Sequence, residues 1–319
     1  MCFNLNKEGV LMKNEQKGIL YAFGAYGIWG LFPLYWRLLD QVDSMEILLS
    51  RVIWSFVFTT VFILILKHKN LLIEDLKTIW KNKKVFLALL AASFAISCNW
   101  FIYIFAVNNG HVIETSLGYY INPLITVVFG MLFFKERLSK MQLVAVIVAF
   151  IGVIVLTVSY GNIPWVAMLL AFSFATYGAL KKKITLDATR GLAIETLFIL
   201  PFALIYYIYI MSTNQMSFLH VSWQTDILLI LAGVVTAIPL VLFSKGAKLL
   251  PQYLIGFIQY ITPTTLLIFG IVLYHETFST IEFISFSFIW LAILIFTVST
   301  IVESRKRHNI EHKVANVEI

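Results

Sequence analysis

The sequence predicts an all-α polytopic membrane protein with ten transmembrane helices, arranged as two inverted five-helix repeats. Three observations predict this fold class: the hydropathy, the placement of basic residues between apolar segments, and an internal repeat. Of the 319 residues, 60% are hydrophobic and only 13% are charged, whereas soluble domains are about one quarter charged. The mean hydropathy is +0.87. So few charges cannot cover a water-facing surface, which excludes a soluble enzyme and a nucleic-acid-binding protein.

A helix that crosses a bilayer needs about 20 mostly apolar residues. Ten segments of the chain meet this requirement. In chain order they are residues 18–36, 45–66, 85–107, 115–134, 141–159, 164–180, 192–211, 226–244, 254–274 and 280–302. The alternative is nine spans with one re-entrant segment.

Basic residues gather in alternate connections between these spans. Of the 24 Lys and Arg residues, all but Arg37 and Arg51 lie in the N-terminal tail, after an even-numbered span or in the C-terminal tail. Because cytoplasmic loops carry an excess of Lys and Arg, this pattern predicts that both termini are cytoplasmic. The same alternation favours an even number of spans.

Two stretches of the chain repeat each other at a distance of 140 residues. The segment YYINPLITVVFGMLFFKERLS at 119–139 and the segment QYITPTTLLIFGIVLYHETFS at 259–279 share seven identical positions, among them Pro123 and Pro263. A weaker match pairs Glu46 with Glu195. The repeat therefore indicates two homologous halves of five spans each.

The expected halves cover residues 18–160 and 161–303. A cytoplasmic tail at 1–17 precedes them and a basic cytoplasmic tail at 304–319 follows. Because five is an odd number, the second half must enter the membrane inverted. The connection after Glu136 is basic, whereas the matching connection after Glu276 is not. Inverted repeats of this kind are typical of secondary transporters.

Ionisable residues inside the predicted spans are functional candidates, because a charge in hydrocarbon is costly. Arg51 has two interpretations. Its guanidinium could bind a substrate carboxylate, or it could form an ion pair that fixes the helix orientation. Glu46 and Glu195 are candidates for ion coupling, although Glu46 lies near enough to a span end to be only solvated.

The two mid-span prolines mark a candidate substrate pocket. Each is expected to break its helix, since the carbonyl four residues before Pro123 or Pro263 loses its usual donor, and broken backbone at membrane depth lines cavities. The predicted substrate-binding residues, with Arg51, are Asn99, Trp100, Tyr119, Tyr120, Asn122, Gln259, Tyr260 and Thr262. Amides and phenols suit a polar organic substrate, and aromatic walls suit amphipathic molecules or organic cations. The alternative is that these side chains only satisfy neighbouring helices.

Four sequence segments are typical of a known transporter family. They are AYGIWGLFPLYWRLL, EILLSRVIWSF, NWFIYIFAVNNGHVIETSLGYYINPL and KERLSKMQ. In them the chain resembles the RarD group of EamA-type transporters, within the drug/metabolite transporter superfamily. The resemblance covers nearly the whole chain. It implies ten helices in two EamA-like halves, a central cavity, a plasma-membrane location and export of small metabolites or drugs.

The expected function is therefore secondary active export of a small organic metabolite or amphipathic drug by alternating access. No nucleotide-binding GxxxxGK[ST] motif and no HExxH motif is present, so neither direct ATP use nor an enzyme is expected. A passive channel or facilitator is the alternative. The expected partners are a small-molecule substrate, membrane lipids and a proton or counter-solute, with a homodimer left open. No cofactor, metal or nucleic acid is expected.

Overall fold

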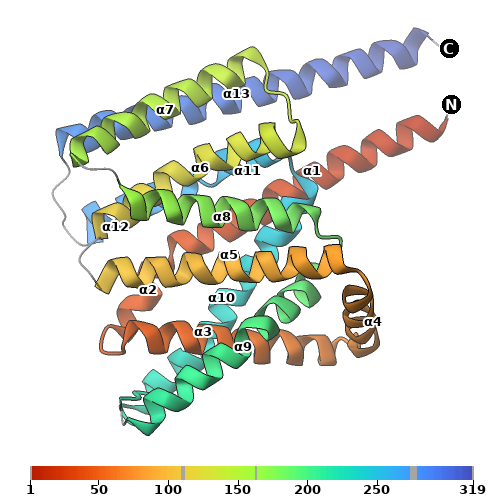
Figure 1. The fold of residues 1–319 in the computed structure, drawn as a ribbon. Coiled ribbons are helices and arrows are strands. Elements are labelled where there is room, and N and C mark those ends of the chain that lie inside the picture. Colours follow the sequence, from red (N-terminus) through yellow and green to blue (C-terminus); the bar gives the residue numbers. More distant parts are fainter. Residues whose placement is uncertain (1, 109–111, 162–163, 214, 274–278, 318–319) are drawn as a thin grey trace.

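The computed structural model describes residues 2–108, 112–161, 164–213, 215–273 and 279–317. All regular elements in these ranges are helices, and most of the long ones lie side by side along one direction (Figure 1). They are α1 (Cys2–Gly30), α2 (Phe32–Trp36), the 3-10 helix η1 (Arg37–Leu39), α3 (Ser44–Ile65), α4 (Lys69–Lys81), α5 (Lys83–Asn108), α6 (Val112–Phe134), α7 (Lys140–Tyr160), α8 (Trp165–Lys183), α9 (Ala188–Ser212), α10 (Trp223–Leu249), α11 (Gln252–Ile258), α12 (Ile261–Leu273) and α13 (Thr280–Val317).

Eight helices of the described residues are long and apolar enough to cross a membrane. They match eight of the ten predicted spans, so the chain is a multi-pass membrane protein. The other two predicted spans are helical but differ in form. The sixth is α8, which ends in three consecutive lysines. The ninth is divided into α11 and α12, and its predicted end at Tyr274 lies outside the described residues, as does Glu276.

The two prolines that were predicted to break helices behave differently. α6 continues through Pro123 to its end, so the predicted break there is wrong; a membrane helix tolerates proline where neighbouring groups compensate for the lost hydrogen bond. In the second half, the helix is interrupted at Gln259 and Tyr260, just before Pro263. The Gln259 carbonyl accepts a hydrogen bond from the Thr262 amide at 3.2 Å, so this carbonyl is not free.

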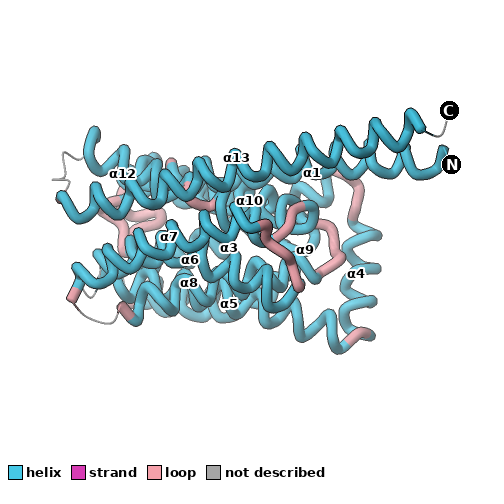
Figure 2. Tube along the Cα trace, turned by 90° about the horizontal axis from the view of Figure 1, so that it is seen from above, coloured by secondary structure: helices cyan, strands magenta, loops and turns pink. Residues whose placement is uncertain are grey.

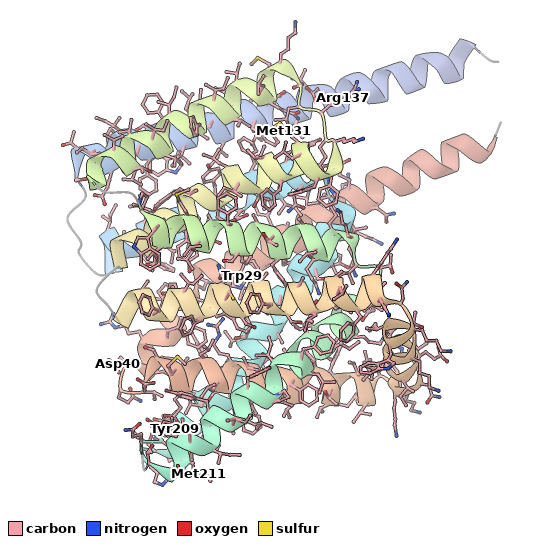
Figure 3. All side chains as sticks on the ribbon, in the orientation of Figure 1. Trp29, Asp40, Met131, Arg137, Tyr209 and Met211 are labelled. Atoms are coloured by element: carbon pink, nitrogen blue, oxygen red, sulfur yellow. The ribbon has the colours of Figure 1, made fainter. Side chains whose placement is uncertain are left out.

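The two described chain ends lie at the same end of the bundle, and α4 lies across that end (Figures 1 and 2). Figure 3 places Arg137 at this end and Asp40 at the opposite one. α4 falls within the basic connection between the second and third predicted spans, where no helix was predicted. Its Ile79 is buried, whereas Trp80 is 79% exposed. This amphipathic character is typical of a helix that lies along a membrane surface.

Capping residues account for several helix ends. The Asp43 carboxylate accepts the Met45 amide at the start of α3. The Asp187 carboxylate accepts two amides at the start of α9. Ser139 and Gln142 form a reciprocal capping box at the start of α7. Each side chain satisfies backbone donors that the first helical turn leaves free.

Helices from the two parts of the chain interleave. α7 packs along α13 and the pair forms an outer layer (Figure 1), while α3 contacts both α9 and α10. α6 contacts α8 and α11, α1 contacts α10, α11 and α12, and α5 contacts α8 and α9. The interior between these helices holds the cavity described next.

Candidate functional site

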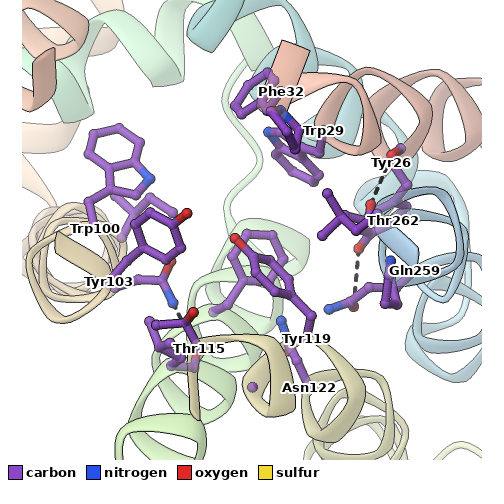
Figure 4. A pocket seen from close by; sticks show the side chains of 18 of the residues that line it. Tyr26, Trp29, Phe32, Trp100, Tyr103, Thr115, Tyr119, Asn122, Gln259 and Thr262 are labelled. Atoms are coloured by element: carbon purple, nitrogen blue, oxygen red, sulfur yellow. Dashed lines mark hydrogen bonds between the residues drawn. The ribbon is translucent and has the colours of Figure 1, made fainter. Parts of the chain in front are cut away.

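A cavity of about 260 Å³ lies inside the bundle, lined by side chains from α1, α2, α3, α5, α6, α8, α10 and α12, together with Gln259 between α11 and α12. Figure 4 shows labelled side chains converging on it from several helices. Seven of the nine predicted substrate-binding residues line it, together with Pro263. The seven are Arg51, Asn99, Trp100, Tyr119, Asn122, Gln259 and Thr262.

One wall of the cavity is a hydrogen-bonded polar cluster. The Tyr26 hydroxyl donates to Gln259 Oε1 at 3.3 Å, and Thr262 Oγ1 donates to the Tyr26 carbonyl at 2.8 Å (Figure 4). The Thr126 hydroxyl lies 3.3 Å from Asn122 Oδ1 and 3.5 Å from Gln259 Oε1. Both amide oxygens therefore have donors in the protein. The amide nitrogens of Asn122 and Gln259 remain toward the cavity (Figure 4).

Arg51 occupies another part of the lining. Its Nε donates to Thr236 Oγ1 at 3.0 Å. Its guanidinium carbon lies 4.9 Å from the ring centroid of Trp100, 5.0 Å from that of Trp36 and 6.0 Å from that of Phe32. In the part of the chain that the structure describes, no carboxylate lies within 4.0 Å of the guanidinium. Aromatic faces, rather than the ion pair considered from the sequence, therefore surround this charge.

Asn99 has a different role from the other cavity amides. Its Nδ2 donates to the Leu170 carbonyl at 2.8 Å and to Ser173 Oγ at 3.0 Å. Both acceptors belong to α8, so this amide joins α5 to α8. The predicted alternative, that a polar residue satisfies a neighbouring helix, describes Asn99 well.

Packed aromatic rings close the cavity toward the end of the bundle where the termini lie. Trp29 contacts Phe174 and Phe243, with ring centroids 5.4 and 5.7 Å apart. Tyr177 stacks on Phe243 at 5.8 Å. Tyr177 and Phe243 are almost fully buried, and they lie toward the ends of α8 and α10 that face the termini (Figure 1).

Two predicted pocket residues, Tyr120 and Tyr260, do not line the cavity. The Tyr120 ring packs against Phe286 of α13 with centroids 4.9 Å apart. Tyr260 is buried in the same hydrophobic cluster. Each directly follows a lining residue, and neighbours along a helix point about 100° apart. The predicted position of these two rings is therefore wrong, although their immediate neighbours line the cavity.

Glu46 and Glu195 also lie outside the cavity, and each is only 1% exposed. The Glu46 carboxylate accepts the backbone amides of Ser217 and Phe218, both at 2.8 Å. Glu195 pairs with Lys181 at 2.7 Å. The alternative given for Glu46, that it is only solvated, is wrong, because the loop before α10 covers it.

Several lining residues were missed from the sequence. They are Tyr26, Trp29, Phe32, Trp36, Tyr103, Thr115, Phe174 and Thr236. A signal for part of this set was present, since Tyr26, Trp29, Pro33 and Trp36 recur three to four residues apart. That spacing places side chains on one face of a helix. Nothing local in the sequence singles out Thr236.

Comparisons with known proteins agree with this architecture. Residues 16–158 match the EamA-like transporter family. A Bacillus subtilis protein named "Uncharacterized transporter YojE" is 48% identical over 286 residues, which cover 90% of this chain and 95% of the relative. The chain belongs to the EamA-like transporter family. The Escherichia coli protein RarD is 40% identical to this EamA-like transporter over 294 residues, covering 92% and 98% of the two chains.

The predicted resemblance to the RarD group of the drug/metabolite transporter superfamily is therefore confirmed. The family description and the name of the Bacillus relative both describe transporters rather than enzymes. A solved crystal structure has the same fold as this EamA-like transporter, with a TM-score of 0.68 and 17% identity. The match covers 89% of this chain and 98% of that chain.

Proposed function

We propose that this EamA-like transporter is a secondary active carrier of the plasma membrane that exports a small organic metabolite or amphipathic drug by alternating access. The carrying observation is the cavity, which is lined by both the N-terminal and C-terminal parts of the chain and closed by aromatic rings toward one end. A mid-depth site that is closed on one side is what alternating access requires. Its proposed partners are the substrate, the membrane lipids and a proton or counter-solute. A second copy of the chain, forming a homodimer, is a further candidate partner.

The proposed carrier consists of two inverted halves, residues 18–160 and 161–303. Helix contacts support this division. If α1, α3, α5, α6 and α7 correspond to α8, α9, α10, the α11–α12 pair and α13, the contacts recur when the halves are exchanged. The α1–α10 contact has its counterpart in α8–α5, and α8–α6 has its counterpart in α1 with α11 and α12. The pairs α3–α9, α6–α11 and α7–α13 join corresponding helices directly.

The proposed orientation has both tails, 1–17 and 304–319, in the cytoplasm. The basic residues support it, because the connections near the described chain ends carry nearly all of them. In this orientation the aromatic closure faces the cytoplasm and the cavity belongs to an outward-facing state. Glu195 then lies at the cytoplasmic side and Glu46 at the outer side, and both remain candidates for coupling.

Cysteine labelling tests the orientation. In a background with Cys2 and Cys98 replaced by serine, Lys81→Cys near the end of α4 should react with an impermeant maleimide only after the cells are permeabilised. Gln215→Cys, in the loop between α9 and α10, should react in intact cells. Both positions are exposed, so access to solvent does not distinguish them. Equal labelling from outside would contradict the orientation.

Flux measurements in liposomes test the carrier mechanism. A panel of carboxylic acids, amino acids, amines and amphipathic drugs should include a solute whose flux saturates and is stimulated by the same solute on the opposite side. Asn122→Leu and Gln259→Leu should reduce that flux, since each removes an amide from the cavity lining. Ser287→Ala should not, because the Ser287 hydroxyl donates only within its own helix. Flux that does not saturate would indicate the passive channel instead, and chemically altered solute would indicate an enzyme.

A further inference from the structure

The charged side chains among the described lining residues are all of one sign, positive. Arg51 supplies a fixed positive charge, and the described lining contains no Asp or Glu. A charge held away from water is costly unless a counter-charge or a strong acceptor compensates it. Thr236 supplies one neutral acceptor to Nε. The two terminal guanidinium nitrogens form no hydrogen bond among the described residues, and together they match the two oxygens of a carboxylate.

The amide groups of Asn122 and Gln259 present donors rather than acceptors to the cavity. Tyr26 and Thr126 already occupy the amide oxygens of Gln259 and Asn122. Within the described residues, the amide nitrogens of Asn122 and Gln259 donate to no protein acceptor. A ligand that fits here must bring acceptors, because an amide N–H without a partner is costly once water is displaced.

The three aromatic rings next to Arg51 do not provide a free cation site. The faces of Trp100, Trp36 and Phe32 already surround the Arg51 guanidinium at 4.9 to 6.0 Å. An organic cation would have to share these rings with a like charge. The rings can still contact a flat apolar body next to a bound carboxylate.

We propose that the substrate class of this cavity is a small organic monoanion: a carboxylate on a flat apolar body, with no ammonium group. Its carboxylate binds Arg51, and any acceptor at its other end binds Asn122 and Gln259. The described lining offers no carboxylate to an ammonium, so a zwitterion binds less well than the simple acid. The volume of about 260 Å³ favours one small molecule. This inference rests on the proposed function, because it assumes that the cavity binds the transported solute.

Four compounds of nearly equal shape separate the charge classes. They are 3-phenylpropionate, the neutral 3-phenylpropanamide, zwitterionic phenylalanine and the cation 3-phenylpropylamine. Binding to the purified full chain is measured at pH 7 by isothermal titration, and thermal stabilisation is measured in parallel. We expect the acid to bind roughly tenfold or more tightly than the amide, since hydrogen bonds to charged groups are the stronger ones. This comparison uses the wild-type chain and needs no variant to fold.

Variants then assign the preference to Arg51. Arg51→Gln should abolish the preference of acid over amide, and Arg51→Lys should retain part of it because the forked geometry is lost. Thr236→Val removes the acceptor that orients Arg51 but keeps the charge, so it should weaken the acid and preserve its rank above the amide. Ser287→Ala should leave all affinities unchanged.

The outcomes distinguish this inference from the proposed function. Tighter binding of phenylalanine, the amine or the amide than of the acid would overturn the anion assignment. If Asn122→Leu abolished that binding, the cavity would still be the solute site. No binding of the acid would also overturn the assignment, while saturable, trans-stimulated flux of another panel solute would leave the carrier mechanism intact. An acid preference that survives in a folded Arg51→Gln variant would place the anion elsewhere.

Discussion

Replacing Gly233 by alanine should destabilise the protein strongly, because at this position α10 crosses α3 with backbone against backbone. A Cβ atom on Gly233 would lie 2.2 Å from the carbonyl carbon of Trp54 and 2.5 Å from the backbone nitrogen of Ser55. The Ser55 hydroxyl also donates to the Gly233 carbonyl at 3.0 Å. One methyl group would therefore force the two helices apart and break this interhelical hydrogen bond.

Overpacking a buried site costs about 1–3 kcal/mol when side chains can yield, and more when backbone must move. We therefore expect Gly233→Ala to lose at least about 3 kcal/mol, measured as a lower unfolding midpoint of the purified protein in detergent. Gly27→Ala is the matched control, since a Cβ there meets nothing within 4 Å. It should be neutral or stabilise α1 by up to about 1 kcal/mol through helix propensity. Equal midpoints for the two variants would contradict the close crossing.

Much of the helical framework was predictable, because it depends on properties that repeat along the chain. Apolar length placed eight of the ten predicted spans on a single helix each, whereas the first covers α1 and α2 and the ninth covers α11 and α12. The polar residues shortly before Pro123 and Pro263 were a useful guide to the cavity, since Asn122, Gln259 and Thr262 all line it. Polar side chains at membrane depth must lie inside the bundle rather than against lipid.

The residue positions that were predicted wrongly depend on the rotation of each helix about its axis and on contacts between segments far apart in the sequence. Tyr120 differs from Asn122 by two positions, yet it faces α13 instead of the cavity. Thr236 becomes important only because α10 brings it within 3.0 Å of Arg51. Composition near one residue gives neither its rotation about the helix axis nor its partner 185 positions away.

The partner of Lys181 could not be predicted from the sequence either, and its position matters for how the cavity is closed. From the sequence, Lys181 is expected in a basic cytoplasmic connection after the sixth span, but α8 extends to Lys183. The Lys181 side chain is 2% exposed and its Nζ lies 2.7 Å from Glu195 Oε1. The other carboxylate oxygen accepts the Tyr177 hydroxyl at 3.3 Å. This buried pair thus joins α8 to α9 directly behind the aromatic rings that close the cavity.

Removing either member of this pair should have the largest effect of any charge change in the described chain. A buried charge that loses its partner costs about 3–5 kcal/mol, whereas replacing both members by apolar residues is often close to neutral. Lys181→Met and Glu195→Leu should each lower the unfolding midpoint sharply, and the double variant should recover most of the loss. Asp75→Asn is the control, because its ion pair with Arg190 is partly exposed on both sides, and it should lower the midpoint less than either single change to the buried pair.

A stability change alone would not connect the Lys181–Glu195 pair to transport. The functional test therefore uses the double variant. With the helices stable but no longer joined by the ion pair, the closed end, which is cytoplasmic in the proposed orientation, should open more often. A conformational equilibrium shifts by the difference in interaction energy between its two states. Tyr177→Cys, buried in the wild type, should then react with a maleimide added to inside-out vesicles several times faster in the double variant. Unchanged reactivity in a stable double variant would show that the pair supports folding without holding this end closed.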